Sequence, residues 1–455
     1  MKHIETNREL VGKILRFSVP LMLTGILQLA YQAADSVIVG RFAGKAALAA
    51  VGSTTSLIFL LVTLFNGVSV GANYLASNRY GAADSEGVAR AVHCAAGLSV
   101  VLGLAAALAG LALSGPLLQA THTAEDVLPL AELYLRIYFL GTPALVVYNF
   151  GSAILRAAGD SSRPLLFMLV SGSVNVALNL FLVVAVRLGV AGVAIATVVS
   201  QYLSAVLVAV RLCAARDCFR LELKRVRFYQ REAALMLKVG LSSGLQGVVF
   251  SVSNVMIQSQ VNTFGSAVMA GNSAASSLEG FIHISQNAFA QASLTFISRS
   301  MGAEKPRRAW HVFWICMALT LSLGLVLCAF LVCFREPLLS FYIKPGEIAG
   351  VLTAGVTRVM VIGAFQWVGG LMETACNSLR GFGKSVNPTV TTLLGACGLR
   401  MVWIYTVFAR SGSIRSLYWS YPASWTLTLA IHGVFLFLVR REVCRRRLQI
   451  EGGAL

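Results

Sequence analysis

A single carboxylate, Asp35, lies in the apolar stretch between Phe17 and Val39. The stretch is long enough to cross a bilayer as a helix, which takes about 20 residues. A carboxylate at that depth costs on the order of 2.5–3.5 kcal/mol on insertion scales, so it persists only where protein or water receives it. Asp35 is therefore a candidate site for a proton or a cation, and a local cap near the outer end of the span is the alternative. Pro20, in the same stretch, removes one backbone hydrogen bond and predicts a hinge.

Two asparagines offer further oxygen ligands. Asn175 and Asn179 are four residues apart in SGSVNVALNLFLV, so they share one face of a helix. Carboxamide oxygens suit a hard cation such as sodium. Thr197, in the next apolar stretch, offers a hydroxyl, and together with Asp35 these residues form a candidate Na+ site. Spacing alone does not show that they converge, and the asparagines can instead hydrogen-bond neighbouring helices.

Three more charged residues lie well inside apolar stretches. Glu279 is part of the polar segment SAASSLEGFIHISQNAF, so we expect it to face a wet cavity or a neighbouring helix. Glu373 nearly coincides with Asn149 when the two halves of the chain are compared. We expect Arg400 to pair with Glu373 as a static bridge. His283 can titrate near neutrality, but a lone histidine is more often structural.

The composition shows what kind of chain must position these residues. Of its 455 residues 57% are hydrophobic and 12% charged, with a mean hydropathy of +0.74. A soluble domain carries about 25% charged residues, so this is an all-α polytopic membrane protein. We predict twelve spans, at 14–40, 52–77, 90–113, 130–155, 165–186, 190–212, 235–262, 267–298, 310–334, 350–379, 388–409 and 416–439.

The net charge of +18 does not indicate a nucleic-acid partner, because the charges cluster in short loops on alternate sides of the spans. Most Lys and Arg residues lie on the side that holds both termini and the basic connection 213–234. Since basic loops stay in the cytoplasm, both termini are predicted to be cytoplasmic in a plasma-membrane protein. The segment 114–129 has no Lys or Arg and is predicted to be external. The basic segments are expected to meet anionic lipid headgroups.

The two halves of the chain repeat each other. The pattern L-R-x-x-G-x-S-x-x-P occurs at 155–164 and again at 379–388, and Arg136 recurs as Arg358. Sequence motifs repeated at matching positions indicate two six-span units in the same membrane orientation. In proteins built this way the substrate path usually lies between the units, and access alternates as one unit rocks against the other. The predicted division is a first bundle at 1–212, the connection 213–234, a second bundle at 235–440 and a basic tail at 441–455.

These features resemble the multidrug and toxic-compound extrusion (MATE) family over essentially the whole chain. The resemblance rests on Pro20, Asp35 with Gly40-Arg41, the R-x-x-G-D-x-x-x-P turn at 156–164, Asn175, Asn179 and Thr197. It implies antiport, in which sodium or protons enter while an organic, commonly cationic, compound leaves. It also implies that the four polar residues form the coupling site. No cofactor besides the coupling ion is expected, and the chain is expected to act as a monomer.

The same resemblance assigns Tyr31 to a tyrosine that neighbours the acid in some members. This chain departs from the family pattern at Asn179, where some members carry a second acid. It departs again in its seventh span, where Gln246 and Asn254 stand in place of a glutamate. The candidates for lining a substrate path are Tyr31, Gln28, Asn149, Gln246, Glu279, Glu373 and Arg400.

Two other functions compete with transport of this kind. Residues 240–244 match the nucleophile pattern G-x-S-x-G, but they begin an apolar helix, so G-x-x-x-G packing is the better interpretation and no enzyme activity is predicted. No Walker loop or zinc spacing occurs, which argues against ATP-driven transport. A lipid-linked precursor flippase has a related architecture, but its cavity needs several basic residues, and Arg400 is the single clear one within a span.

Overall fold

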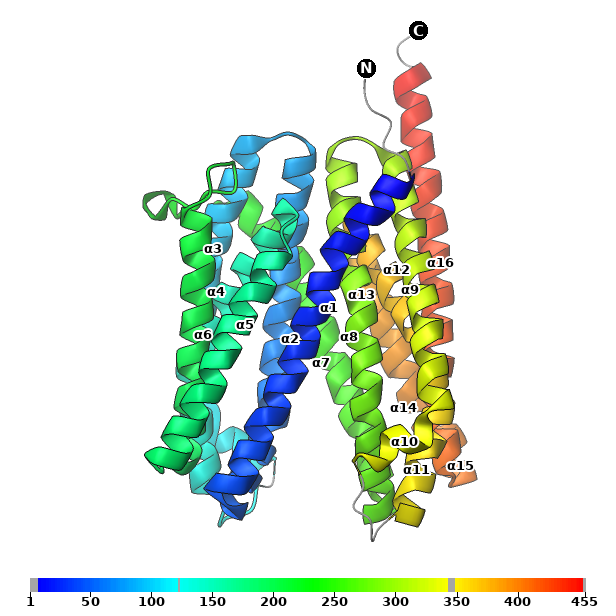
Figure 1. Cartoon of the computed structure of the whole chain (residues 1–455). Helices are drawn as coiled ribbons and strands as arrows, with labels where there is room; N and C mark the ends of the chain where they lie inside the picture. Colours follow the sequence, from blue (N-terminus) through cyan, green and yellow to red (C-terminus); the bar gives the residue numbers. More distant parts are fainter. Residues whose placement is uncertain (1–6, 122, 343–347, 453–455) are drawn as a thin grey trace. The chain divides into compact units, whose positions relative to one another are not determined.

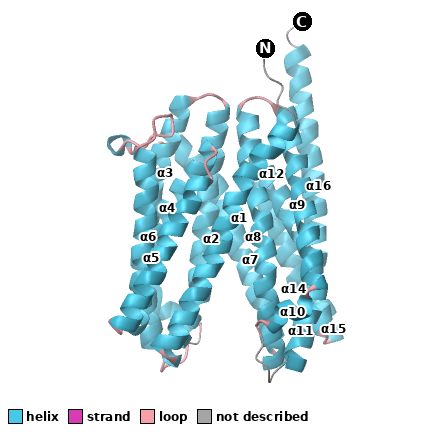
Figure 2. Cartoon of the chain, in the orientation of Figure 1, coloured by secondary structure: helices cyan, strands magenta, loops and turns pink. Residues whose placement is uncertain are grey.

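The computed structural model describes residues 7–121, 123–342 and 348–452, and all regular structure in these ranges is helical (Figure 2). Eleven helices in this part of the chain are long and apolar enough to cross a membrane. The remaining predicted span, 267–298, corresponds to α8 (Ser266–Gly302), which is 37 residues long but has no 18-residue stretch as apolar as those of the other eleven. The all-α polytopic fold is therefore confirmed, and the predicted spans coincide with helices that extend a few residues beyond them.

The first half of the chain contains the following helices. They are α1 (Asn7–Ile38), η1 (Val39–Ala43), α2 (Lys45–Gly81), α3 (Ser85–Ala120), α4 (Leu128–Ala158), α5 (Ser162–Asn179), η2 (Leu180–Ala185) and α6 (Gly189–Cys213). The π-helices η1 and η2 extend α1 and α5, so that each pair forms one span.

The connection and second half continue the pattern. They contain η3 (Leu223–Arg225), α7 (Gln230–Asn262), α8, α9 (Pro306–Cys333), α10 (Arg335–Ser340), α11 (Ile348–Val361), η4 (Gly363–Phe365), α12 (Gln366–Gly381), α13 (Val386–Thr392), η5 (Leu393–Gly398), α14 (Leu399–Trp403), η6 (Ile404–Phe408), α15 (Ala409–Ser411) and α16 (Ile414–Gly452). The predicted basic tail falls on the end of α16, and its side chains from residue 443 onward lie outside the described residues.

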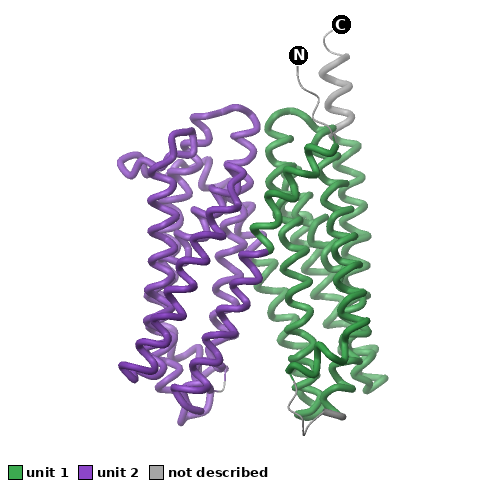
Figure 3. Tube along the Cα trace, viewed as in Figure 1, with its two compact units in different colours: residues 1–22, 245–455 green, residues 23–244 purple. Residues whose placement is uncertain are grey.

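The chain divides into two compact units (Figure 3). We call residues 23–244 the N unit, and residues 1–22 with 245–455 the C unit. The borders fall inside α1 and α7 rather than in the 213–234 connection, where the loop composition placed the division.

The contacts of α1 explain the first border. Leu10, Ile14 and Phe17 are buried in a core of the C unit, where the rings of Phe17 and Phe296 meet edge to face with centroids 5.5 Å apart. α1 is helical through Pro20, and the change of unit comes two residues later. The residue predicted as a hinge therefore lies next to the point where α1 passes from one unit to the other.

The beginning of α7 packs in the N unit through glycines. Gly240 and Gly244 on α7 approach Gly67 and Gly71 on α2 so closely that a Cβ atom on Gly71 would overlap the carbonyl oxygen of Met236. A Cβ atom on Gly67 would likewise overlap the backbone of Gly244. Close approach of this kind is the use that membrane helices make of G-x-x-x-G, so the packing interpretation of residues 240–244 is confirmed.

The internal repeat is also present in the backbone. Gly44 before α2 and Gly265 before α8 share a left-handed conformation, with φ of 90° and 92°. Gly159 and Gly383, the glycines of the repeated sequence pattern, have φ of 91° and 87°. L side chains rarely adopt these angles, so glycine is required at each matched turn.

The loops of each unit agree with the predicted orientation. In the N unit, the loops 82–84, 159–161 and 213–229 lie at one end (Figure 1). The last of these is tied to α3, because the Glu222 N–H donates a hydrogen bond of 3.1 Å to His93 Nε2. In the C unit, α1 begins and α16 ends at the same end of the unit. The side of the membrane on which these ends lie stays a prediction.

Candidate functional site

The N unit brings three of the four predicted coupling residues together. Asn179 Nδ2 donates a hydrogen bond of 2.6 Å to Asp35 Oδ1 and another of 3.3 Å to Asn175 Oδ1. Asn179 is fully buried, Asn175 is 6% exposed, and Asp35 is half-buried. The contact joins α1 to α5, so a carboxylate and two carboxamides from separate spans form one polar cluster.

One oxygen of this cluster has no partner. Asn179 Oδ1 is buried without a hydrogen bond among the described residues. A buried carbonyl oxygen of an amide is costly to leave unpaired, and it suits a hard cation held beside a carboxylate. No group of three His, Cys, Asp or Glu side chains in the described ranges can hold a metal ion. With one carboxylate and neutral oxygens, the donor set fits a monovalent cation better than a divalent one.

The local helix geometry helps to position the cluster. α5 changes to a π-helix directly after Asn179, and α1 does so three residues after Asp35. Insertions of this type leave backbone groups less regularly bonded and occur often at functional sites. Tyr31, one turn before Asp35, packs on Gly172 of α5, and its hydroxyl donates to the Leu169 carbonyl at 3.3 Å.

Thr197 is not part of the observed contacts. Its hydroxyl donates to the carbonyl of Val193 at 3.0 Å, which is a bond within α6.

Of the other candidates in the N unit, Gln28 is exposed on α1. Asn149 is buried on α4, and its Nδ2 has no partner among the described residues.

Glu279 does not face an open cavity. Its carboxylate receives three hydrogen bonds from Arg358, the shortest 2.7 Å from Nη2, and both side chains are at least nine-tenths buried. Arg358 Nη1 also donates to Asn272 Oδ1 at 2.7 Å, and the hydroxyl of Tyr418 donates to the same oxygen at 3.0 Å. This network joins α8, α11 and α16 of the C unit. The prediction of a neighbouring helix was the better of the two alternatives.

The predicted bridge between Glu373 and Arg400 is wrong. Glu373 accepts a short hydrogen bond from Asn287 Nδ2, and His283 Nδ1 lies 3.7 Å from its other oxygen. Arg400 instead donates to Asn254 Oδ1. A position in the sequence does not show which neighbouring helix a side chain faces, and here the two residues face different partners.

Gln246 takes a structural part in the C unit. Its Oε1 accepts a hydrogen bond of 2.6 Å from Arg380 Nη2, the arginine of the second repeated turn. No site was predicted from the sequence for Arg358, Asn272 or Asn287. Arg358 stood out only as the repeat of Arg136, and no spacing rule connects it with Glu279, 79 residues away.

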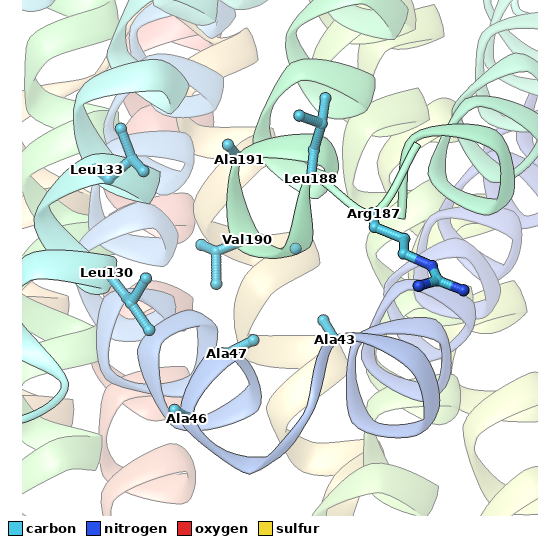
Figure 4. Close-up of a pocket in the computed structure, with 10 residues that line it drawn as sticks. Ala43, Ala46, Ala47, Leu130, Leu133, Arg187, Leu188, Val190 and Ala191 are labelled. Atoms are coloured by element: carbon cyan, nitrogen blue, oxygen red, sulfur yellow. The ribbon is translucent and has the colours of Figure 1, made fainter. Parts of the chain in front are cut away.

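A pocket lies elsewhere, at the end of the N unit (Figure 4). It has a volume of about 210 Å³ and is lined mainly by alanine and leucine side chains, with Arg187 as the charged member. The residues come from η1, α2, α4 and the first turn of α6, and from the turn between η2 and α6. None of the predicted coupling residues lines it, so it belongs to a different part of the unit.

Comparison with known proteins gives a family match. The MatE family profile matches residues 20–181 and 243–406, which covers most of the chain and both repeats. The chain is 30% identical over 303 residues to "Probable multidrug resistance protein YpnP" of Bacillus subtilis, covering 67% of this chain and 68% of that protein.

Two further relatives extend over 95% of this chain and of their own length. One is "Probable multidrug resistance protein YoeA" of Bacillus subtilis, at 26% identity. The other is "FAD transporter" of Shewanella oneidensis, at 21% identity.

Solved structures share the fold. A structure described as "Outward-facing conformation of a multidrug resistance MATE family transporter of the MOP superfamily" matches with a TM-score of 0.86 at 21% identity, over 96% of each chain. Another, "Crystal structure of MATE in the bent conformation", matches with a TM-score of 0.85 at 20% identity, over 96% of this chain and 99% of that one.

Proposed function

The chain belongs to the MatE family of multidrug efflux transporters, and from this premise we propose that it exports organic compounds by antiport with Na+ or H+. The observation that carries the proposal is the Asp35–Asn179–Asn175 cluster of the N unit. It is a carboxylate at membrane depth with an unpaired amide oxygen beside it. Such a site needs a cation or a proton to complete it.

The carboxamide of Asn179 gives the cluster two arrangements. Its amino group donates to Asp35 Oδ1 in the observed arrangement, which suits a charged carboxylate. Rotated by half a turn, the amide directs its carbonyl oxygen at Asp35, an arrangement that requires a proton or a cation between the two oxygens. The occupancy of Asp35 is thereby coupled to the position of an α5 side chain. We propose that this coupling distinguishes the two access states.

Sodium and protons compete at one site in this proposal. Bound Na+ would be held by Asp35 and the carbonyl oxygens of Asn179 and Asn175, and it would supply the positive charge that a proton supplies otherwise. A driving ion moves the protein only if it binds the two access states with different affinity. Pro20, on the same helix, supplies a place where α1 can bend in response.

The cargo that we propose is an organic, amphipathic cation. Glu373, with a side chain 26% exposed, is the more accessible of the two acids that the C unit holds within its predicted spans, whereas Arg358 neutralises Glu279. The names of the relatives refer both to multidrug resistance and to FAD transport, so the family does not by itself fix the cargo. The plasma membrane, with both termini in the cytoplasm, is the proposed location.

The test is transport by purified protein in proteoliposomes. An inward-directed Na+ or proton gradient should drive loss of a cationic dye, and Asp35→Asn should abolish the gradient-dependent part. Asp126→Asn, which removes an exposed acid from the 121–127 segment, is the matched control and should transport like the wild type. Gradient-driven efflux at the wild-type rate in Asp35→Asn would place the coupling elsewhere.

A further inference from the structure

Arg400 is the largest fully buried side chain of the described residues, with none of its surface exposed. It lies on α14, a helix of five residues between the π-helices η5 and η6. Span eleven therefore departs from α-helical geometry on both sides of this arginine. π-helical segments are frequent at functional sites.

All observed partners of Arg400 are neutral. Its Nη1 donates to Asn254 Oδ1 at 2.9 Å and its Nε to Ser424 Oγ at 3.1 Å. The guanidinium carbon lies 4.1 Å from the ring centroid of Tyr421, 4.8 Å from that of Phe250 and 5.9 Å from that of Trp425. Nη2 is buried and has no hydrogen-bond partner in the described part of the chain.

Arg358, another buried arginine of the C unit, has the counter-charge that Arg400 lacks. Arg358 is neutralised by Glu279 and further bonded to Asn272. Arg400 forms no ion pair with any acidic residue in the described ranges, since Glu279 and Glu373 are bonded to other partners. Burying a cation without a counter-charge is costly. Rings that stack on the guanidinium reduce that cost, but they do not supply a hydrogen-bond acceptor for Nη2.

The internal repeat places Arg400 at a position that corresponds to the coupling cluster. Arg400 lies as far beyond Pro388 as Val176 lies beyond Pro164, so its counterpart in the N unit is the neighbour of Asn175. In the N unit, a carboxylate on the first span meets amides on the fifth. In the C unit, an amide on the seventh span meets a guanidinium on the eleventh. The two units therefore carry opposite charges at matched places.

We propose that Arg400 forms a binding site for one small monovalent anionic group, either a chloride ion or a carboxylate. The group would bind at Nη2 and supply the acceptor and the negative charge that the described side chains lack. Because three aromatic rings lie within 6 Å of the guanidinium carbon, a small group fits this proposal better than a larger polyanion. This site is separate from the cation site proposed for the N unit.

The test measures binding through thermal unfolding and does not use transport. Purified protein in lipid nanodiscs is heated while potassium sulfate is replaced stepwise by potassium chloride or by potassium acetate at constant ionic strength. A ligand of the folded state raises the midpoint by mass action, and we expect a saturable rise of about 2 °C or more. A response to chloride alone identifies an inorganic ion as the ligand, and a response to acetate alone identifies a carboxylate.

Three variants make the assignment specific. Arg400→Gln should lose the anion response. Asn254→Asp supplies a built-in carboxylate 2.9 Å from Nη1, so it should fold, melt at a higher temperature in sulfate and no longer respond to anions. Asn272→Asp is the matched control, because it places the same change beside Arg358, which Glu279 already neutralises. It should be less stable and keep the response.

The proposal is overturned if neither anion raises the midpoint of the wild type. It is also overturned if the response persists in Asn254→Asp, or if this variant fails to fold. Asn254→Asp decides the matter even where Arg400→Gln does not fold.

Discussion

The phenol ring of Tyr31 on α1 occupies the space in which a Cβ atom of Gly172 on α5 would lie. The contact is one helical turn from Asp35 and one turn from Asn175, so it sets how closely the two helices of the coupling cluster approach. Gly172 has the backbone angles of an ordinary helix, so its conformation does not require glycine. Glycine is required here because any side chain would overlap the Tyr31 ring. The spacing between Asp35 and Asn179 therefore depends on a residue that has no polar side chain.

Gly172→Ala should weaken coupling without removing any polar group. The added methyl group displaces the Tyr31 ring and separates α1 from α5, which lengthens the 2.6 Å contact between Asn179 and Asp35. We expect a lower apparent affinity for the driving ion, measured as the Na+ or proton concentration for half-maximal dye efflux. Gly172→Ala combined with Tyr31→Ala should recover part of the affinity, since the clash is then relieved. An unchanged half-maximal concentration in Gly172→Ala would contradict the spacing argument.

Asn179→Asp should change the ion preference of the cluster. A second carboxylate beside Asp35 repels it unless a cation lies between them, so the variant should depend more strongly on Na+. Efflux measured against Na+ concentration at constant pH checks this expectation. Asn179→Asp should not fully rescue Asp35→Asn, because the carboxylate would then come from α5 instead of α1. Full rescue would show that either helix can carry the coupling charge.

The close packing of α2 on α7 predicts a stability effect. Gly71→Val forces side-chain atoms into the carbonyl of Met236, and overpacking of this kind costs about 1–3 kcal/mol or more. The thermal unfolding midpoint in detergent should fall. Gly52→Ala on the same helix, where nothing lies within 4 Å of a new Cβ, is the control and should leave the midpoint unchanged. Equal midpoints for Gly71→Val and the wild type would contradict the observed approach.

The ion pair of Glu279 and Arg358 should be structural. Glu279→Gln leaves a buried guanidinium without its counter-charge, and breaking such a pair costs about 3–5 kcal/mol. Replacing both partners, as Glu279→Gln with Arg358→Met, should restore much of the stability, because no uncompensated charge remains. Thermal unfolding of the single and double variants measures the difference. A double variant that is less stable than Glu279→Gln alone would show that Arg358 has a further role.

The spans and the repeat could be predicted because they depend on local composition. Apolar runs placed every membrane-length helix, and α8 was found although its polar face weakens the signal. The approach of Asp35 to the Asn175–Asn179 face was expected from the family resemblance, because the spacing of these residues alone did not show that they converge. Partner choice within the C unit was not predictable. Whether Arg400 faces Glu373 or Asn254 depends on the rotation of span eleven, and the π-helices η5 and η6 alter that rotation.

Membrane orientation is the last prediction. Ala124 is exposed in the segment 123–127, which has no Lys or Arg, and Lys224 is exposed in the basic connection. Because basic loops stay in the cytoplasm, an impermeant thiol reagent added to intact cells should label Ala124→Cys and spare Lys224→Cys, both in a cysteine-free background. Lysing the cells should make Lys224→Cys reactive, which controls for its accessibility. The reverse labelling pattern would place the termini outside and invert the direction of the proposed antiport.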